Sequence, residues 1–293
     1  MSSFEQISGF YDLDYPEDSD RAFLSKLVTA AAPRHVLEIP CGCGRNVAVL
    51  LAATSGRVTF MDIAEPMVNG ASRRIPDSER DRAGAVVGDM RSLGVSREFD
   101  LVVCPREAFQ LLDRSDAARA LRSMAASITG DGLIVIDLFR FASTPAPASD
   151  APPDYFSPGE PGWVEDWTRS TADGSLTVTR RRRQEVTAGG IHFDMSYTLR
   201  AHSERRPRVI DLAFDMTNYS RGGFCRLAAQ SGLDVLAAFA GYSGAPAMTS
   251  RSLRTVFVLG HERYQKGAER LKRISGQIAA ARRASQADEP DAC

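Results

Sequence analysis

The stretch HVLEIPCGCGRNVAVLL, residues 35–51, passes from a strand pattern through a glycine turn directly into a helix pattern. The apolar residues on both sides of Glu38 are typical of a short buried strand in a parallel sheet. Gly42 and Gly44 follow at once, and apolar residues then recur at helical spacing. Glycines let the backbone approach a ligand closely, and the amides at a helix start can bind an anionic group or a ribose.

The composition is ordinary for a folded chain. Of its 293 residues 43% are apolar and 25% charged, which suits one large domain or two small ones. The formal net charge of −1 gives no indication of nucleic-acid or membrane binding, so we expect neither partner. The five cysteines are odd in number, and the acidic N-terminus lacks a signal-peptide pattern. We therefore expect a cytoplasmic protein, and the longest apolar runs are too short to span a membrane.

Strand and helix patterns alternate through the first half of the chain. The predicted strands are 35–39, 57–63, 84–90, 99–105 and 132–139. The predicted helices are 20–31, a segment ending near Ala53, 66–74 and 115–132, the last one closed by glycine. Repeated strand–helix units of this length favour a parallel sheet covered by helices on both faces.

The second half of the chain changes in character after residue 142. A proline-rich stretch up to residue 162 is predicted as a loop or mobile lid. Residues 163–216 alternate polar with apolar side chains between turn signals, which predicts an antiparallel β insert. Residues 220–240 return to a helix and a strand, and 253–260 supply the last strand.

These patterns divide the chain into three parts. We expect a core formed by residues 1–143 with 217–262, and a lid with β insert on the substrate side at 144–216. The remaining residues 263–293 are predicted to be a polar, solvated tail.

Two carboxylates follow the second and third predicted strands. Asp62 lies eighteen positions beyond Gly44, where it can accept hydrogen bonds from both hydroxyls of a ribose. Asp89 follows the next strand, where it can receive an adenine amino group. Ligands of open α/β sheets bind at the carboxyl ends of the strands, so these residues together predict a nucleoside site.

Four segments occur in the order, and with roughly the spacing, of the class I S-adenosylmethionine-dependent methyltransferases: VLEIPCGCGRN, VTFMDIAEPMV, VVGDMRSL and FDLVVCPREAFQLL. The chain resembles this family over roughly residues 10–260. The resemblance implies an α/β fold: a Rossmann-like seven-stranded sheet with its last strand antiparallel, helices on both faces, and an antiparallel β insert. The residues that it places around S-adenosylmethionine are Tyr11, Glu38, Gly42, Gly44, Asp62, Met67, Asp89, Met90 and Cys104.

One departure from the family pattern is Pro40, which stands where the first glycine is usual and removes an amide donor. A nicotinamide-binding Rossmann domain shares the ribose acid, but its third glycine would fall at Val47.

Cys41 and Cys43 lack the second ligand pair that zinc requires, so no metal is expected. The run 180–183 is all arginine, and we expect a solvated strand edge there in preference to an anion patch.

The segment that follows the fourth strand faces the transferable methyl in the family plan, and it supplies the catalytic candidates Arg106 and Glu107, with His192 of the insert beside them. Leu111 and Leu112 are assigned to the core. Tyr11 is expected to close over the cofactor, although a packing role remains open for it. The substrate-binding candidates are Tyr15, Phe109, Gln110, Tyr197 and Tyr242.

An amine is the easiest acceptor for such a site. An α-amine with a pKa of ~8 is partly unprotonated near neutral pH, whereas an alcohol needs a base, and histidine is scarce in this chain. Glu107 is expected to hold the incoming ammonium group.

The β insert and the segment 241–259 resemble two groups of natural-product enzymes, the deoxyaminosugar N-methyltransferases and, more closely, the peptide α-N-methyltransferases. We therefore predict an enzyme that methylates the terminal amine of a modified ribosomal peptide. Three alternatives remain: a sugar or other small amine as acceptor, O-methylation with His192 as base, and a non-catalytic partner protein that binds S-adenosylmethionine.

Overall fold

The computed structural model describes residues 3–14, 19–141, 156, 162–187, 189–201, 203–204, 206–247, 253–261, 274 and 276. The substrate candidate Tyr15 and most of the proline-rich stretch lie outside these residues. Of the predicted solvated tail, only Ile274 and Gly276 are described, and Ile274 is buried in the core. Within the described part of the chain, no helix has the length and apolarity that crossing a membrane requires.

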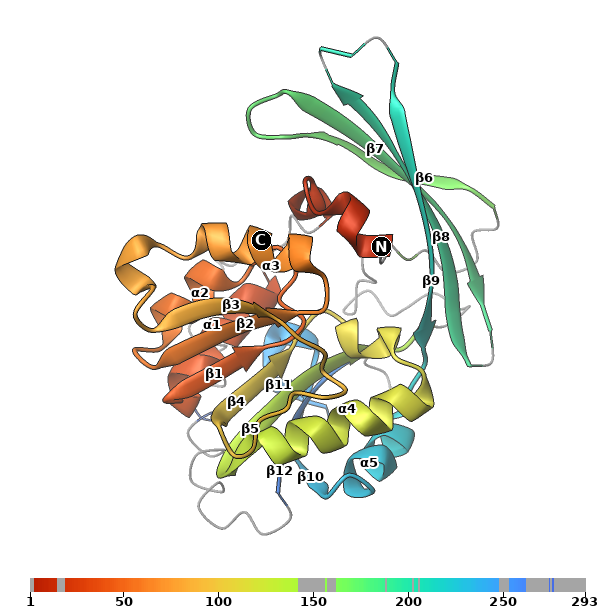
Figure 1. Ribbon diagram of the computed structural model, residues 1–293. Coiled ribbons are helices and arrows are strands. Elements are labelled where there is room, and N and C mark those ends of the chain that lie inside the picture. The colour runs from red at the N-terminus through yellow and green to blue at the C-terminus, as the bar shows by residue number, and fades with distance from the viewer. Residues whose placement is uncertain are drawn as a thin grey trace, which may run out of the picture.

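The large sheet contains the strands expected of the core (Figure 1). Its members are β1 (His35–Glu38), β2 (Arg57–Asp62), β3 (Ala83–Val87), β4 (Phe99–Cys104), β5 (Ile128–Phe139), β10 (Leu233–Ala240), β11 (Ala245–Pro246) and β12 (Arg254–His261). The order is β11-β10-β12-β5-β4-β1-β2-β3, and neighbours from β5 to β3 pair in parallel. The last strand, β12, is antiparallel to both β5 and β10, as predicted. The two-residue β11 adds a short edge to the seven expected strands.

Helices cover both faces of this sheet. They are α1 (Ser19–Ala31), α2 (Val47–Ala53), α3 (Glu65–Arg74), α4 (Arg114–Ser127) and α5 (Arg221–Ala229). The first three pack on one face of the sheet, and α4 and α5 pack on the other. Successive side chains of a strand point to opposite faces, so each buried strand contributes apolar side chains to both layers. The prediction that a helix extends from 115 to a terminal glycine at 132 is wrong. Ile128 already pairs with Phe99 of β4, so the strand β5 begins there and the helix ends at Ser127.

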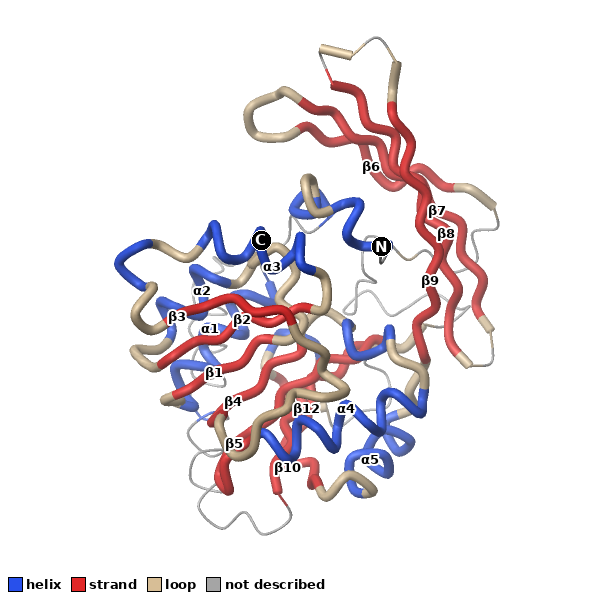
Figure 2. The backbone as a smooth tube through the Cα atoms, in the orientation of Figure 1, coloured by secondary structure: helices blue, strands red, loops and turns tan. Residues whose placement is uncertain are grey.

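The insert is a separate antiparallel sheet, as predicted. Its strands are β6 (Val164–Ser170), β7 (Leu176–Val186), β8 (Gly190–Ala201) and β9 (Arg208–Thr217), paired in that order. Figure 2 shows this sheet standing apart from the large sheet, with the N-terminal segment between them.

The expected solvated edge at the arginine run is wrong. β7 pairs with β6 on one side and β8 on the other, so it is an interior strand. Arg180 and Arg182 are each 2% exposed, whereas Arg181 and Arg183 point to the opposite, solvent-exposed face. The alternation expected of a strand is therefore present, but the two arginines on one of its faces are buried.

The N-terminal segment joins the core to the insert. It contains two 3-10 helices, η1 (Ser3–Ile7) and η2 (Tyr11–Asp14). Phe10 of this segment packs against Tyr197 of β8 with ring centroids 5.3 Å apart. On the core side, the Cys43 thiol donates a hydrogen bond of 3.3 Å to the carbonyl of Ser8. One hydrophobic cluster therefore runs from the glycine turn through this segment into the insert.

Candidate functional site

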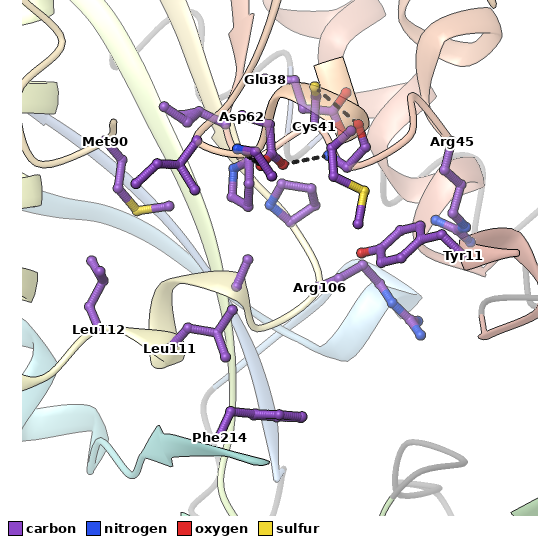
Figure 3. A pocket seen from close by; sticks show the side chains of 18 of the residues that line it. Tyr11, Glu38, Cys41, Arg45, Asp62, Met90, Arg106, Leu111, Leu112 and Phe214 are labelled. Atoms are coloured by element: carbon purple, nitrogen blue, oxygen red, sulfur yellow. Dashed lines mark hydrogen bonds between the residues drawn. The ribbon is translucent and has the colours of Figure 1, made fainter. Parts of the chain in front are cut away.

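A cavity of about 360 Å³ lies at the carboxyl ends of β1, β2 and β4 (Figure 3). Three parts of the chain form its wall: the strand ends of the core, the η2 segment, and the inward face of the insert. Of the predicted site residues, those that line it are Tyr11, Glu38, Gly42, Asp62, Met67, Asp89, Met90, Arg106 and Tyr197. The described residues contain no group of three or more side chains suited to a metal ion.

The glycine turn has the left-handed backbone that its sequence indicates. Gly42 has φ of 52°, and a Cβ there would lie 3.0 Å from the ring of Tyr11 at the cavity wall. Gly44, with φ of 82°, does not line the cavity, which contradicts its expected contact with the cofactor. A Cβ at Gly44 would lie 2.6 Å from the Cα of Ala71, so this glycine allows α3 to pack against the turn.

Asp62 is held in place by the turn that it faces. Its carboxylate accepts hydrogen bonds of 2.9 Å from the Gly42 amide and 3.0 Å from the Ala64 amide, one on each oxygen (Figure 3). Burial raises the pKa of Asp62, and the two amides offset part of that rise. Each carboxylate oxygen still has a lone pair for a ligand hydroxyl, so the side chain suits the ribose role predicted for it.

Glu38 presents a buried acceptor to the same cavity. The Asn46 side-chain amide donates a hydrogen bond of 2.6 Å to Glu38 Oε1. Glu38 Oε2 and Asn46 Oδ1 are buried and have no hydrogen-bond partner in the described structure. Burial raises the pKa of Glu38 to about 8. Asn46 Oδ1 and, once Glu38 is ionised, Glu38 Oε2 are buried acceptors on the wall of the cavity, and they are suited to a ligand with several donors, such as an ammonium group.

Asp89 lies at the next strand end, but its carboxylate is already engaged. The Arg91 side chain donates to it from Nε at 2.9 Å, and reaches Asp116 with Nη1 at 2.6 Å. Hydrogen bonding from Arg91 lowers the pKa of Asp89. All three side chains line the cavity. The expected contact of Asp89 with an adenine amino group stays a prediction.

The opposite wall is built by η2 and the insert, and sequence reasoning found only part of it. Asp14 is buried there, with Arg180 Nη1 donating to it at 2.6 Å and the Tyr197 hydroxyl at 3.0 Å. The apolar side chains on this wall are Met195, Phe214 and Met216, and Leu111 and Leu112 of the turn after β4 also line the cavity. On β8, Met195 has the same parity as Tyr197, so strand alternation was the signal that could have found it.

Several predicted residues lie behind the wall. Glu107 is fully buried, pairs with Arg254, and donates its backbone amide to Asp137 at 2.8 Å. This placement contradicts the expectation that Glu107 receives an ammonium group. Phe109 and Gln110 are also fully buried, and the Gln110 side chain donates to the Phe139 carbonyl at 2.9 Å.

The turn after Pro105 has unusual backbone: Arg106 and Glu107 both have left-handed φ, 57° and 54°. Arg106 lines the cavity, whereas Glu107 is buried behind it. Leu111 and Leu112, which were assigned to the core, line the cavity as well.

Two more candidates belong to the interior. Cys104 is fully buried in the core beneath α4, and burial raises the pKa of its thiol. Tyr242 packs against Phe23 and donates its hydroxyl to Asp137, so it does not bind ligand at the mouth of the cavity. Arg251, which neighbours this segment, lies outside the described residues.

His192 faces away from the cavity. On β8 its neighbours Phe193 and Met195 are buried, whereas His192 is on the exposed face with Nδ1 2.8 Å from Asp215. The hydrogen bond with Asp215 raises the pKa of His192. A role as the base of an O-methyl transfer is therefore contradicted by its position.

Residues 36–132, which contain the glycine turn and both strand-end acids, match the family described as a methyltransferase domain. The chain carries a methyltransferase domain. No curated protein matches the sequence. Among solved structures, the methyltransferase is similar to a S-adenosylmethionine-dependent methyltransferase from Clostridium acetobutylicum, with 14% identity over 87% of this chain and 96% of that one and a TM-score of 0.64.

Two further structures share the fold of the methyltransferase. The sugar N-methyltransferase KedS8 from Streptoalloteichus is 18% identical over 86% of this chain and 92% of that one, with a TM-score of 0.64. The amino pentose methyltransferase CalS10 from Micromonospora echinaspora, solved with S-adenosylmethionine bound, is 18% identical over 86% and 96%, with a TM-score of 0.61.

The cavity of the methyltransferase fits S-adenosylmethionine, its cofactor. When bound, that cofactor supplies a methyl group activated on a sulfonium. The free acceptors of Glu38 and Asn46 suit its ammonium group, and Asp62 suits its ribose hydroxyls. Met67 and Met90 offer apolar surface beside them. The protein's own task is to align an acceptor with the methyl and to exclude water.

Proposed function

We propose that this methyltransferase acts on an amine, and that its acceptor is the terminal α-amine of a modified ribosomal peptide made as a natural product. The observation that carries the amine proposal is the buried carboxylate of Asp14 on the acceptor wall. Transfer of a methyl to an amine produces a cation, and a nearby carboxylate stabilises that developing charge.

The lack of a histidine base among the described cavity residues also supports an amine acceptor. No histidine is among the described residues that line the cavity. An alcohol would need such a base, whereas a neutral amine already has a nucleophilic lone pair. Glu38, Asp62 and Asp89 lie at the strand ends assigned to the cofactor, and Asp116 of α4 pairs with Arg91 beside Asp89. Asp14 is the remaining acid of the described cavity wall, and it lies on the insert side.

The peptide acceptor is supported by the apolar part of that wall. Met195, Phe214 and Met216 project from neighbouring insert strands toward the cavity. A peptide terminus presents an α-amine beside a side chain, so an apolar first residue would cover this surface. The four described cysteines are free thiols, which suits a reducing compartment, and we propose that the reaction takes place in the cytoplasm.

An aminosugar is the second candidate. It is favoured by the two fold neighbours KedS8 and CalS10, whose names describe a sugar N-methyltransferase and an amino pentose methyltransferase. Sugars carry many hydroxyls, however, and the wall formed by Leu111, Leu112 and Phe214 offers them few hydrogen-bonding partners.

Mass spectrometry distinguishes these acceptors. The protein is incubated with S-adenosylmethionine and peptides with a free N-terminus and an apolar first residue, their N-acetylated counterparts, and a panel of aminosugars. We expect one or two methyl increments on the free peptides, none on the acetylated ones, and release of S-adenosylhomocysteine. The Asp14→Asn variant should lose turnover while it still binds the nucleoside. Methylation of the aminosugars alone would replace the peptide proposal, and methylation of acetylated peptides would overturn the amine proposal.

A further inference from the structure

The backbone at Arg106 and Glu107 is in an unfavourable conformation. Both residues have left-handed φ, 57° and 54°, and neither is a glycine. In this region the Cβ atom of an L-residue crowds the following carbonyl oxygen, so two such residues in succession persist only where the surroundings hold them. Conformations of this kind gather at ligand sites.

A buried polar cluster holds this turn from behind. Its members come from the turn, from β5, from η5 (Gly241–Ser243) and from β12: Glu107, Asp137, Tyr242 and Arg254. The Glu107 amide donates to Asp137 Oδ1 at 2.8 Å, and Arg254 Nη1 donates to Asp137 Oδ2 at 2.8 Å. Arg254 also pairs with the Glu107 carboxylate and donates to the Tyr242 hydroxyl at 2.9 Å.

The cluster fixes the two side chains of the turn in opposite directions. Glu107 is fully buried within it, and Arg106, one residue earlier, lines the cavity. Figure 3 shows the Arg106 side chain at the cavity wall in the neighbourhood of Tyr11.

The same cavity already provides for an ammonium group through Glu38 and Asn46. In an amino acid the carboxylate is attached to the same carbon as the ammonium, so it enters the cavity together with it. The planar fork of an arginine matches a carboxylate with two parallel hydrogen bonds.

We propose that the buried cluster of Glu107, Asp137, Tyr242 and Arg254 is a positioning device, which keeps Arg106 in the cavity wall as the receptor for the carboxylate of the cofactor's amino-acid group. The inference rests on S-adenosylmethionine as cofactor. Arg106 contacts the ligand, and the cluster acts through Arg106.

Calorimetry with two nucleosides tests the receptor. S-adenosylhomocysteine carries the amino-acid group, and 5′-methylthioadenosine lacks it. Arg106→Gln should weaken binding of S-adenosylhomocysteine by about tenfold or more and leave methylthioadenosine unchanged. An equal loss for both nucleosides, or for neither, overturns the receptor role. A selective loss in Arg45→Gln with none in Arg106→Gln assigns the carboxylate to Arg45, and also overturns it.

The positioning role is tested with residues that do not line the cavity. Glu107→Gln keeps the size of the side chain, and Arg254→Lys keeps the buried positive charge. Each should reproduce the selective loss for S-adenosylhomocysteine, and the double variant Arg106→Gln/Glu107→Gln should lose no more than Arg106→Gln alone. The exposed Arg80→Gln serves as control. If the cluster variants lower the unfolding temperature but bind both nucleosides as the parent does, the cluster is merely structural and the proposal is wrong.

The cofactor assignment and the role of Arg106 are distinguished by the parent protein. A parent protein that binds neither nucleoside overturns the cofactor assignment itself. A parent that binds both, with an unchanged Arg106→Gln variant, overturns only the role of Arg106.

Discussion

Arg180 donates a hydrogen bond of 2.6 Å to the carboxylate of Asp14, although 166 residues separate them in the chain. The same guanidinium donates from Nε to Asp166 at 3.0 Å, and its side chain is 2% exposed. The acceptor wall is therefore joined to the N-terminal segment by buried charges. Buried ion pairs of this kind are costly to break, because the partner left behind keeps an uncompensated charge.

We expect Arg180→Met to destabilise the fold by ~3–5 kcal/mol, since it leaves the buried Asp14 without its cation, whereas Asp166 keeps Arg182 at 2.7 Å. The matched control is Arg183→Met on the same strand, whose side chain is 55% exposed and pairs with Asp194. That variant should change the free energy of unfolding by less than ~1 kcal/mol. Urea unfolding of both variants measures the difference, and equal effects would show that the buried network contributes nothing special.

Glu38 should couple nucleoside binding to pH. Burial raises its pKa to about 8, so in the ligand-free protein at neutral pH it is mostly protonated. An ammonium group beside it favours the ionised form and lowers that pKa, so binding releases a proton. The affinity for S-adenosylhomocysteine should therefore rise with pH toward about 8, and it should fall at higher pH as the ligand's own ammonium group loses its proton. Calorimetry in buffers of different ionisation enthalpy measures the proton release directly.

Two comparisons make the Glu38 prediction specific. Glu38→Gln should abolish the proton release, because the amide does not titrate in this range. Methylthioadenosine, which has no ammonium group, should release no proton from the parent protein. Proton release of equal size with both nucleosides would assign the titration to another group.

Gly44 should tolerate no side chain. A Cβ there would lie 2.6 Å from the Cα of Ala71, and the backbone φ is 82°. Gly44→Ala should therefore cost ~2–4 kcal/mol, from the clash and the left-handed backbone together. A Cβ at Gly84 of β3 would meet no atom within 4 Å, and φ there is not positive, so Gly84→Ala should be neutral or slightly stabilising. Thermal unfolding of the pair measures this, and similar unfolding temperatures would contradict it.

Asp62→Asn should weaken binding of methylthioadenosine by about tenfold to a hundredfold. The asparagine amide has a single oxygen, so it can accept from only one of the Gly42 and Ala64 amides and turns its NH2 donor toward the other, and one of the two ribose acceptors is lost. Asp211→Asn on the exposed face of the insert is the control. Titration by calorimetry gives both constants, and unchanged binding in Asp62→Asn would place the ribose elsewhere.

The sequence predicts the strands and the glycine turn of the core well, because local chemistry decides them. The buried run before Glu38, the glycine turn and Asp62 are specified by apolar pattern and by glycine placement, and these form as expected. The β insert was also predicted, since alternation and turn residues specify antiparallel strands without reference to distant contacts.

The cavity wall on the insert side was predicted poorly, because contacts between residues far apart in the sequence decide its structure. No local sequence pattern predicts that Arg180 forms a hydrogen bond with Asp14, or that β7 is an interior strand of its sheet. Glu107 was assigned to the cavity because its segment follows the fourth strand, but Arg106 and Glu107 have left-handed backbone and Glu107 is buried behind the wall. Such a conformation at two residues with side chains depends on the cluster around Arg254, which the chain supplies far downstream.

The hydrogen bonds between η2 and the insert have a consequence for engineering. A chimera that receives β6–β9 from another enzyme would separate Arg180 and Tyr197 from their shared carboxylate on Asp14. The module that has to be transplanted to change acceptor choice is therefore discontinuous: residues 3–14 must travel with the strands. Because these contacts join the two segments, a substitution in residues 3–14 should be coupled to substitutions in β6–β9.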